Sequence, residues 1–316
     1  MEEIILITGG AGSIGSRLAR KLLQSNCQII ILDNLSSSYV WNIPVSNNVL
    51  FIKGDILNDD DLEKVFSYKP EIVYHLAAFF ANQNSVEHPK DDLLANALGT
   101  LKILQYSLLN KCRRVIYASS GCSIYGSDAK IPISEDNPTT LYLETPYQVT
   151  KMTGECYCNY FYKYYGLDVV KARLFTCYGP GEVPGKYRGV IANFFYNALT
   201  RKPLVITGTG KESRDFTYTD DVAEALVLMK NEQNIIAGES FNVASGIEIF
   251  IEQIVKYFVE KFNVEVVYTN RRSWDHHTRV QADISKIKNM LGYEPKTTLK
   301  DGLMNTYNWF IENWEN

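Results

Sequence analysis

The chain has 316 residues, of which 46% are hydrophobic and 22% are charged, and its formal net charge at pH 7 is −4. This mild acidity gives no reason to expect nucleic acid or an anionic membrane as a partner, and no apolar run is long enough to span a bilayer. A chain longer than most single domains is expected to form one large domain with an additional lobe. The first strand begins almost at the N-terminus, so we expect no signal peptide and a cytoplasmic protein.

The cysteines and histidines predict neither disulfides nor a metal site. The adjacent His276 and His277 match no zinc spacing, so no metal ion is expected. The six cysteines show no framework spacing and no C-x-x-C pair, and we interpret them as buried thiols in a reducing compartment. They are Cys27, Cys112, Cys122, Cys156, Cys158 and Cys177.

The N-terminal segment has the order strand, glycine turn, helix, strand and acid. Residues 4–8 form an apolar, β-branched run, residues 9–15 read GGAGSIG, and an amphipathic helix and a second strand at 28–32 lead to Asp33. Glycines let the backbone approach a pyrophosphate, the helix N-terminus offers free N–H groups, and Asp33 can accept the ribose hydroxyls. Because that carboxylate would repel a 2′-phosphate, the pattern predicts NAD rather than NADP. The alternative is a glycine-rich turn without a ligand.

Strands and helices alternate through the next part of the chain. We predict strands at 49–53, 71–75, 113–119 and 167–174, and helices at 59–67, 90–110 and 145–165. This alternation predicts an α/β fold with a doubly wound, parallel Rossmann sheet. Beyond Phe175 the elements become shorter, which indicates a smaller C-terminal α/β lobe. We predict an NAD-binding domain over 1–175, with roughly 214–245 folding back onto it, and a substrate lobe made of 176–213 and 246–316.

Polar and small residues follow two of these strands, at the sheet edge where ligands bind in such folds. Asp55 and Ile56 follow the strand at 49–53, and the small residues Ala77 and Ala78 follow the strand at 71–75. Small side chains would let a cofactor lie against the backbone. Asp55 has a second interpretation as the N-cap of the helix at 59–67, and both roles can hold.

Tyr147 and Lys151 lie four residues apart in the helix predicted at 145–165, so they share one helix face. The ammonium, with a positive nicotinamide ring, is expected to lower the tyrosine pKa from about 10 toward neutrality. Such a tyrosine is a competent general base for an alcohol or sugar hydroxyl. Alone, the pair would be an ordinary surface pair; the dinucleotide pattern and Ser119-Ser120 at the preceding strand end favour the catalytic interpretation.

These motifs together resemble the extended short-chain dehydrogenase/reductase family, in particular its NAD-dependent nucleotide-sugar epimerases and dehydratases. The resemblance implies bound NAD, a nucleoside-diphosphate sugar as substrate, and removal of a hydride from the sugar, usually at C4. In the epimerases the 4-keto intermediate rotates and receives the hydride on its other face. The residues that carry the resemblance are Gly9-x-x-Gly12-x-x-Gly15, Asp33, Asp55-Ile56, His75-Leu76-Ala77-Ala78, Asn96-x-x-Gly99-Thr100, Ser119-Ser120, Ile124-Tyr125-Gly126, Tyr147-x-x-x-Lys151, Tyr178-Gly179-Pro180-Gly181 and Arg214-Asp215-Phe216-x-Tyr218-x-Asp220-Asp221.

The resemblance also implies the site residues. The catalytic group would be Tyr147, Lys151 and Ser120. The cofactor would contact Gly9, Gly12, Ser13, Ile14, Gly15, Asp33, Asn34, Asp55, Ile56, Leu76, Ala77, Ala78, Asn96, Ser119, Tyr147 and Lys151. The substrate would contact Ser120, Thr176, Val190, Asn193, Arg214 and Arg279.

Two positions depart from the family pattern. The usual catalytic serine or threonine falls on Gly121, so we assign the hydroxyl to Ser120, with Ser123 as the second choice. Thr176 stands where the family usually has asparagine, and it keeps a hydroxyl donor but has a shorter reach.

Cys122 and Ser123 distinguish the branches of the family. The 4,6-dehydratases carry an Asp-Glu pair, or at least a glutamate, at these positions, and a thiol and an alcohol are poor substitutes. The sequence therefore predicts a nucleotide-sugar 4-epimerase, with a UDP-hexose as the expected substrate. A dehydratase or reductase of the same family is the alternative, and a non-catalytic NAD-binding regulator is a remote one.

Arg214 resembles the diphosphate-binding arginine of the family, since a guanidinium suits bidentate phosphate binding. Its alternative role is a salt bridge with Asp215 or Asp220. Arg279 and Asp275 are expected to close over the phosphate and ribose.

The two long helices at 90–110 and 145–165 resemble those that pair into a four-helix bundle between subunits in this family. A homodimer is therefore expected. The alternative is that the second lobe covers both helices.

Overall fold

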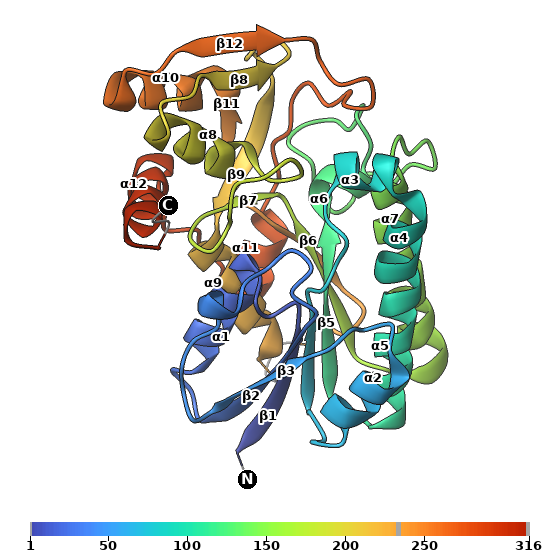
Figure 1. Ribbon diagram of the computed structural model, residues 1–316. Coiled ribbons are helices and arrows are strands. Elements are labelled where there is room, and N and C mark those ends of the chain that lie inside the picture. The colour runs from blue at the N-terminus through green and yellow to red at the C-terminus, as the bar shows by residue number, and fades with distance from the viewer. Residues whose placement is uncertain (1, 232–234, 314–316) are drawn as a thin grey trace.

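A seven-stranded parallel sheet organises the larger lobe of the computed structural model, which describes residues 2–231 and 235–313 (Figure 1). The strand order is β10-β6-β5-β4-β1-β2-β3, so the order reverses between β1 and β4, where ligands bind in doubly wound sheets. The strands are β1 (Glu3–Thr8), β2 (Cys27–Asp33), β3 (Val49–Lys53), β4 (Ile72–His75), β5 (Arg114–Ser120), β6 (Val169–Leu174) and β10 (Ser240–Val243).

Helices cover both faces of this sheet, because its strands are apolar on both sides. Successive residues of β1 illustrate this, since Ile5 and Ile7 pack in one core and Leu6 packs in the other. The first core holds α1 (Ser13–Leu22), α9 (Thr219–Lys230) and α11 (Ser285–Leu291). The second core holds α2 (Asp59–Phe66), α5 (Gly99–Leu109) and α7 (Pro146–Tyr165). The predicted doubly wound α/β fold is confirmed.

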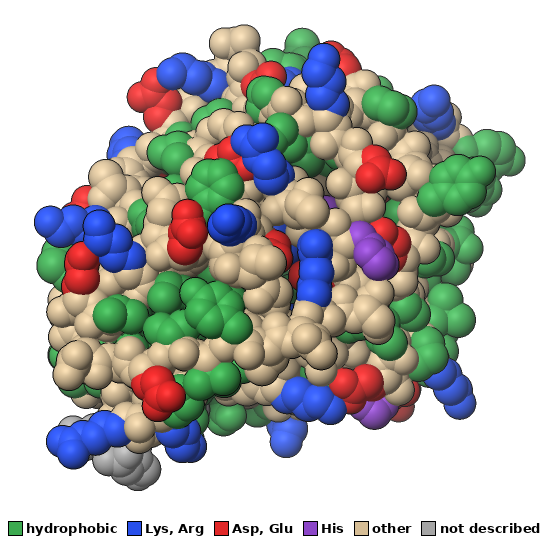
Figure 2. Space-filling view, turned by 90° about the horizontal axis from the view of Figure 1, so that it is seen from above, with side chains coloured by type: hydrophobic (Ala, Val, Ile, Leu, Met, Phe, Trp, Pro, Cys, Tyr) green, Lys and Arg blue, Asp and Glu red, His purple; other side chains and the backbone are tan. Residues whose placement is uncertain are grey.

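The smaller lobe lies beyond the carboxyl ends of the strands (Figure 1). It contains a three-stranded sheet of β7 (Thr176–Tyr178), β9 (Ser213–Tyr218) and β11 (Glu248–Phe250), and a parallel pair of β8 (Leu204–Thr207) and β12 (Val266–Thr269). An aromatic core that includes Phe195, Phe258 and Phe310 joins these strands to α8 (Val190–Leu199), α10 (Ile251–Phe262) and α12 (Leu299–Asn313). Seen from this side, acidic and basic side chains are mixed over the surface (Figure 2).

The chain crosses between the lobes at different points from those predicted. Helix α9 packs on α1 and β10 pairs with β6, whereas β9, also expected on the larger lobe, belongs to the three-stranded sheet of the smaller one. The prediction also placed all of 246–316 in the smaller lobe, but Ile287 and Leu291 of α11 lie in the core of the larger lobe. Their i,i+4 spacing indicates one buried helix face, and only the tertiary structure decides which sheet that face covers.

The helix predicted at 90–110 is divided. It consists of α4 (Pro89–Asp92), a π-helical segment η2 (Leu93–Leu98) and α5. Three short elements lie where no helix was predicted: η1 (Val40–Asn42), α3 (Asn82–Glu87) and α6 (Gly121–Ile124). All six cysteines are free thiols. Among the described residues no helix has the length and apolar character needed to cross a membrane.

Candidate active site

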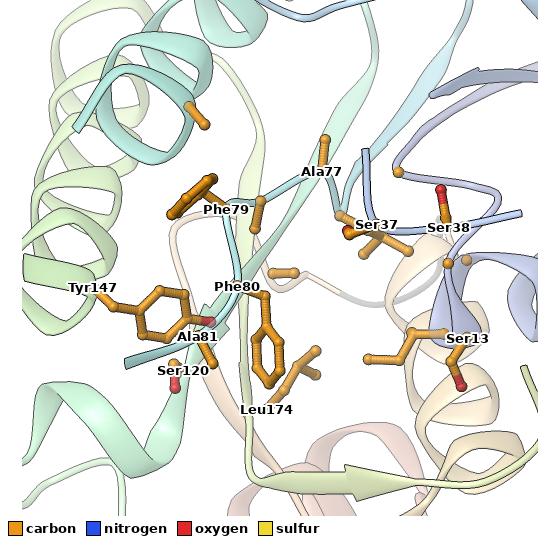
Figure 3. A pocket seen from close by; sticks show the side chains of 18 of the residues that line it. Ser13, Ser37, Ser38, Ala77, Phe79, Phe80, Ala81, Ser120, Tyr147 and Leu174 are labelled. Atoms are coloured by element: carbon orange, nitrogen blue, oxygen red, sulfur yellow. The ribbon is translucent and has the colours of Figure 1, made fainter. Parts of the chain in front are cut away.

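A cavity of about 670 Å³ lies at the carboxyl edge of the central sheet (Figure 3). The start of α1 and the ends of β2, β4 and β5 form its walls, together with the first turns of α7. Tyr147 and Ser120 lie on one side of this cavity, and Ser13, Ser37 and Ser38 lie on the other (Figure 3). We call it the first cavity.

The turn between β1 and α1 has the geometry that a dinucleotide site needs. Gly9 has a φ of +71°, and a Cβ there would lie 2.6 Å from the backbone nitrogen of Ala77. Only glycine therefore lets this turn pack against the backbone that follows β4. Gly9, Gly12, Ser13, Ile14 and Gly15 line the first cavity, as do Leu76, Ala77 and Ala78 on the facing wall.

Asp33 stands at the end of β2 and lines the first cavity. Its carboxylate accepts hydrogen bonds from the Ala11 backbone N–H at 2.9 Å and from the Ser38 hydroxyl at 2.7 Å. These donors fix the carboxylate where it can accept ribose hydroxyls, as predicted for NAD. The Ser119 hydroxyl, on the opposite wall, is buried without a hydrogen-bond partner among the residues that the structure describes. Together, the close glycine turn, the oriented carboxylate and this available hydroxyl fit a bound dinucleotide.

Asp55 and Asn34 form a polar pair next to Asp33. The Asn34 side-chain amide donates to the Asp55 carboxylate at 2.9 Å, and Asn34, Asp55 and Ile56 line the first cavity. The N-cap of α2 is Asn58, whose side chain accepts from Asp60 and Asp61. The capping interpretation of Asp55 is therefore wrong.

Asn96 is predicted to contact the cofactor but does not line the first cavity. Its buried carboxamide accepts from the Phe79 backbone N–H at 2.8 Å and donates to the Phe79 carbonyl at 3.1 Å. Phe79 does line the cavity, so the contacts of Asn96 hold the backbone of that wall in place.

Tyr147 and Lys151 project from the first turns of α7. A capping box of Thr145 and Gln148, with Pro146 at the first helical position, starts the helix at this point. The Lys151 ammonium donates to the Ala118 carbonyl at 2.9 Å and lies 5.7 Å from the centroid of the Tyr147 ring. Both side chains are buried and line the first cavity, so the predicted pair is brought together.

Burial dominates the electrostatics of this pair. It lowers the pKa of Lys151 to about 8, and it raises the pKa of Tyr147 above its ordinary value despite a hydrogen bond with Ser120. The sequence predicts a lowered tyrosine pKa, and the chain's own groups do the opposite. The ammonium alone does not compensate for desolvation of the phenol.

Packing explains why residue 121 is a glycine and not the serine or threonine usual in the family. A Cβ at this position would lie 2.1 Å from the ring of Phe175, so the aromatic ring occupies the space that a serine side chain would need. Ser120, one residue earlier at the end of β5, lines the cavity and forms a 2.8 Å hydrogen bond with the Ser123 hydroxyl. Both serines considered from the sequence therefore belong to one hydrogen-bonded pair.

A second cavity of about 710 Å³ lies in the smaller lobe. Thr176, Arg188 and Arg214 line both cavities, so the second cavity adjoins the first, and Val190 and Asn193 line the second alone. The substrate residues predicted on α8 and at Thr176 and Arg214 thus lie around one space.

Arg214 has a different ion-pair partner from the two considered. Its guanidinium lies 3.2 Å from the Asp275 carboxylate, whereas Asp220 pairs with Arg17. The carboxylate of Asp215 is buried among backbone N–H groups and the Ser245 hydroxyl. The partner of Arg214, Asp275, also lines the second cavity, and their ion pair holds the guanidinium in the wall of that cavity.

Arg279, predicted to contact the substrate, lies apart from both cavities. This side chain is exposed, forms an ion pair with Glu248 and lines neither cavity. Arg272, which the sequence interpretation overlooked, lines the second cavity together with Asp275. The signal for it was the run Arg271-Arg272 three residues before Asp275, which offers two cations beside the expected acid.

Comparison with known proteins places this geometry in context. The model of the NAD dependent epimerase/dehydratase family matches residues 5–244. The structure is similar to that of epimerase Mth375 from Methanothermobacter thermautotrophicus, with 48% identity, a TM-score of 0.96, and coverage of 99% of this chain and 93% of the other.

Two further solved structures carry ligands. UDP-glucose 4-epimerase from Thermotoga maritima, solved with UDP-glucose, is 34% identical over 99% of this chain and 100% of its own, with a TM-score of 0.92. UDP-glucuronic acid 4-epimerase from Bacillus cereus, in complex with UDP-glucuronic acid and NAD, is 30% identical over 98% of this chain and 99% of its own, with a TM-score of 0.89.

Replacing Gly121 with serine tests the packing explanation for this position. We expect Gly121→Ser to lower the free energy of unfolding by about 1–3 kcal/mol, because the new side chain overlaps the Phe175 ring. Urea unfolding measures the effect. In a Phe175→Leu background the same substitution should cost less, and an equal cost in both backgrounds would contradict the explanation.

The lowered pKa of Lys151 predicts a pH-dependent stability. Between the folded pKa of about 8 and the ordinary value of 10.5, the unfolded chain binds a proton that the folded chain does not. The stability of the wild type relative to Lys151→Met should therefore be constant below about pH 8 and rise from there to about pH 10.5. Urea unfolding of both proteins over this range measures the difference, and a pH-independent difference would refute a depressed lysine pKa.

Proposed function

Because the chain belongs to the NAD-dependent epimerase/dehydratase family, we propose that it is a 4-epimerase of a nucleoside-diphosphate sugar, with a UDP-hexose as substrate. One observation carries the proposal. Tyr147, Lys151 and Ser120 line a cavity that fits NAD, and this cavity adjoins a second one lined by arginines. The reacting carbon of a sugar held between the two would lie beside the tyrosine.

The roles follow from the contacts. Bound NAD would supply the acceptor and donor of the hydride, and its positive charge would favour the phenolate of Tyr147. Tyr147 takes the proton of the sugar hydroxyl and later returns it. Its raised pKa means that it needs cations nearby for this step, and Lys151, 5.7 Å from the ring centroid, is the chain's own. Ser120, hydrogen-bonded to Ser123, orients the hydroxyl and relays the proton.

Cys122 argues against the dehydratase alternative. Elimination of water needs a carboxylate acid or base at this part of the wall, and burial raises the pKa of the Cys122 thiol to about 11. The thiol is therefore neutral near pH 7 and does not replace a carboxylate. The remote alternative, a non-catalytic regulator, leaves the buried Tyr147 and Lys151 pair without a purpose.

The second cavity supports a nucleoside diphosphate as the anchoring group. Arg214 and Arg272 offer guanidinium groups for the phosphates, and Asp275 can accept ribose hydroxyls. The UDP-sugars in the Thermotoga maritima and Bacillus cereus structures support uridine as the base.

The activity is tested by incubating the purified protein, without added cofactor, with a panel of UDP-, GDP-, CDP- and dTDP-sugars and resolving the products by NMR. A C4 epimer formed without added NAD supports the proposal and names the substrate. A keto-deoxy product identifies a dehydratase, and net consumption of reduced cofactor identifies a reductase. Absence of reaction from a protein that contains NAD favours the regulator.

Tyr147→Phe should retain NAD and lose nearly all turnover, a loss of at least about a hundredfold, because the cofactor does not need the phenol's proton and the sugar does. NAD content is read from the absorbance of the released cofactor, and turnover from the product that the panel identifies. Tyr142→Phe is the matched control, since Tyr142 is 92% exposed and lines neither cavity. Wild-type turnover by Tyr147→Phe would disprove the mechanism.

We also propose that the protein is a homodimer in which α5 and α7 of each subunit form a four-helix bundle. Large apolar side chains on these helices remain exposed to solvent, including Leu109 at 76% and Tyr164 at 72%. The smaller lobe does not cover them, because both helices lie along the side of the larger lobe (Figure 1).

The double variant Leu109→Glu/Tyr164→Glu should convert the dimer to a monomer, because two carboxylates per subunit would be buried in the interface. Light scattering coupled to gel filtration measures the mass. Val45→Glu, which changes a fully exposed residue outside these helices, should leave the dimer intact. A wild-type protein that elutes as a monomer at micromolar concentration would contradict the proposal.

A further inference from the structure

Residues 179–189, between β7 and α8, cross from the smaller lobe to the rim of the first cavity. We call this segment the clasp. Its own Glu182, Arg188 and Gly189 line that cavity. Four places on the larger lobe hold it, and they are distributed around the cavity.

Two anchors hold the start of the clasp above the glycine turn. The Ser13 hydroxyl donates to the Pro180 carbonyl at 2.8 Å, and the Asn42 side-chain amide donates to the Gly181 carbonyl at 3.1 Å. Asn42 is buried and also donates to the Ala11 carbonyl at 3.0 Å, so it ties the clasp directly to the turn that would hold the pyrophosphate.

Two further anchors hold the end of the clasp at opposite sides of the cavity. The Arg188 guanidinium donates to the Ser37 carbonyl, in the loop that contacts Asp33. Lys186 and Tyr187 both bind the Glu87 carboxylate, at 2.6 and 2.7 Å, and Glu87 ends α3. Ser37 and Tyr147 lie on opposite sides of the cavity (Figure 3). Ala81 lies on the Tyr147 side, and α3 begins directly after it.

These hydrogen bonds persist at neutral pH. Hydrogen bonds from Lys186, Tyr187 and Gln83 lower the pKa of Glu87 to about 2, so its carboxylate stays ionised. Bonds between charged partners of this kind are stronger than neutral ones.

We propose that the clasp retains NAD between turnovers and that Arg188 is the positioning residue that keeps it closed. A dinucleotide lying from Asp33 to Tyr147 passes beneath the clasp, so it cannot leave until the clasp detaches from the larger lobe. An epimerase returns its hydride to the sugar and regenerates NAD in place, so a closed cofactor mouth does not hinder turnover. The sugar nucleotide has its own entrance through the second cavity.

This inference rests on NAD binding and on no particular sugar, and its test therefore measures release of the cofactor. Protein containing NAD is mixed with an excess of isotopically labelled NAD, and the exchange of bound cofactor is followed by mass spectrometry in the absence of any sugar. We expect Arg188→Ala to exchange NAD about tenfold faster than the wild type, the effect of losing one charge-assisted hydrogen bond. Arg188→Lys, which keeps a donor, should be intermediate.

A second variant and a control make the test independent of misfolding. Asn42→Ala removes the anchor to Gly181 and should also speed exchange, whereas Arg201→Ala, which changes an exposed arginine that lines neither cavity, should not. Circular dichroism and thermal midpoints report whether each variant is folded. Unchanged exchange in folded Arg188→Ala and Asn42→Ala overturns the clasp and leaves the proposed epimerase activity intact. If the two variants exchange NAD faster than the wild type while the wild type converts no sugar, the result supports the clasp and overturns the activity.

Discussion

The buried carboxylate of Asp215 joins the two lobes. Asp215 lies in β9 of the smaller lobe, and it accepts hydrogen bonds from the Ser245 and Gly246 backbone N–H groups at 2.8 and 2.9 Å, and from Ala282 at 3.2 Å. Ser245 and Gly246 follow β10 of the central sheet, and Ala282 precedes α11, which packs on that sheet. Burial raises the pKa of Asp215, and these donors oppose that shift by favouring the charged form. Because Arg214 is its neighbour in β9, this contact also determines where the two cavities meet.

Desolvation shifts the pKa values of the acidic and basic groups in the first cavity in opposite directions. It lowers the pKa of Lys151 to about 8 and raises the pKa values of Tyr147 and Cys122. In the chain alone, burial favours the neutral phenol of Tyr147 and disfavours the charged ammonium of Lys151. In the proposed mechanism a positively charged cofactor favours the phenolate, which gives a reason for Tyr147 and the NAD-binding residues to share one cavity.

Under the proposed function, the arrangement separates the cofactor, which stays bound, from the sugar nucleotide, which is exchanged. The first cavity is crossed by residues 179–189, which attach to Ser13, Asn42, Ser37 and Glu87. The second cavity is built from the smaller lobe and adjoins the first at Thr176, Arg188 and Arg214. A reaction that oxidises and then reduces the same sugar suits such a molecule, because only the sugar nucleotide must enter and leave.

The sequence by itself determined the features that arise from neighbouring residues. The strand, glycine turn, helix and Asp33 follow one another directly, and Tyr147 and Lys151 share a face because one helix turn separates them, so local pattern predicts both. The tertiary structure alone decided the rest, since it depends on contacts between distant segments. The ring of Phe175 excludes a side chain at Gly121, and the pKa of Tyr147 depends on burial by the whole site. That Arg272 lines the second cavity and Arg279 does not depends on the path of the segment before α11. No local pattern contains those distances, because the partners are far apart in the sequence and only tertiary packing brings them together.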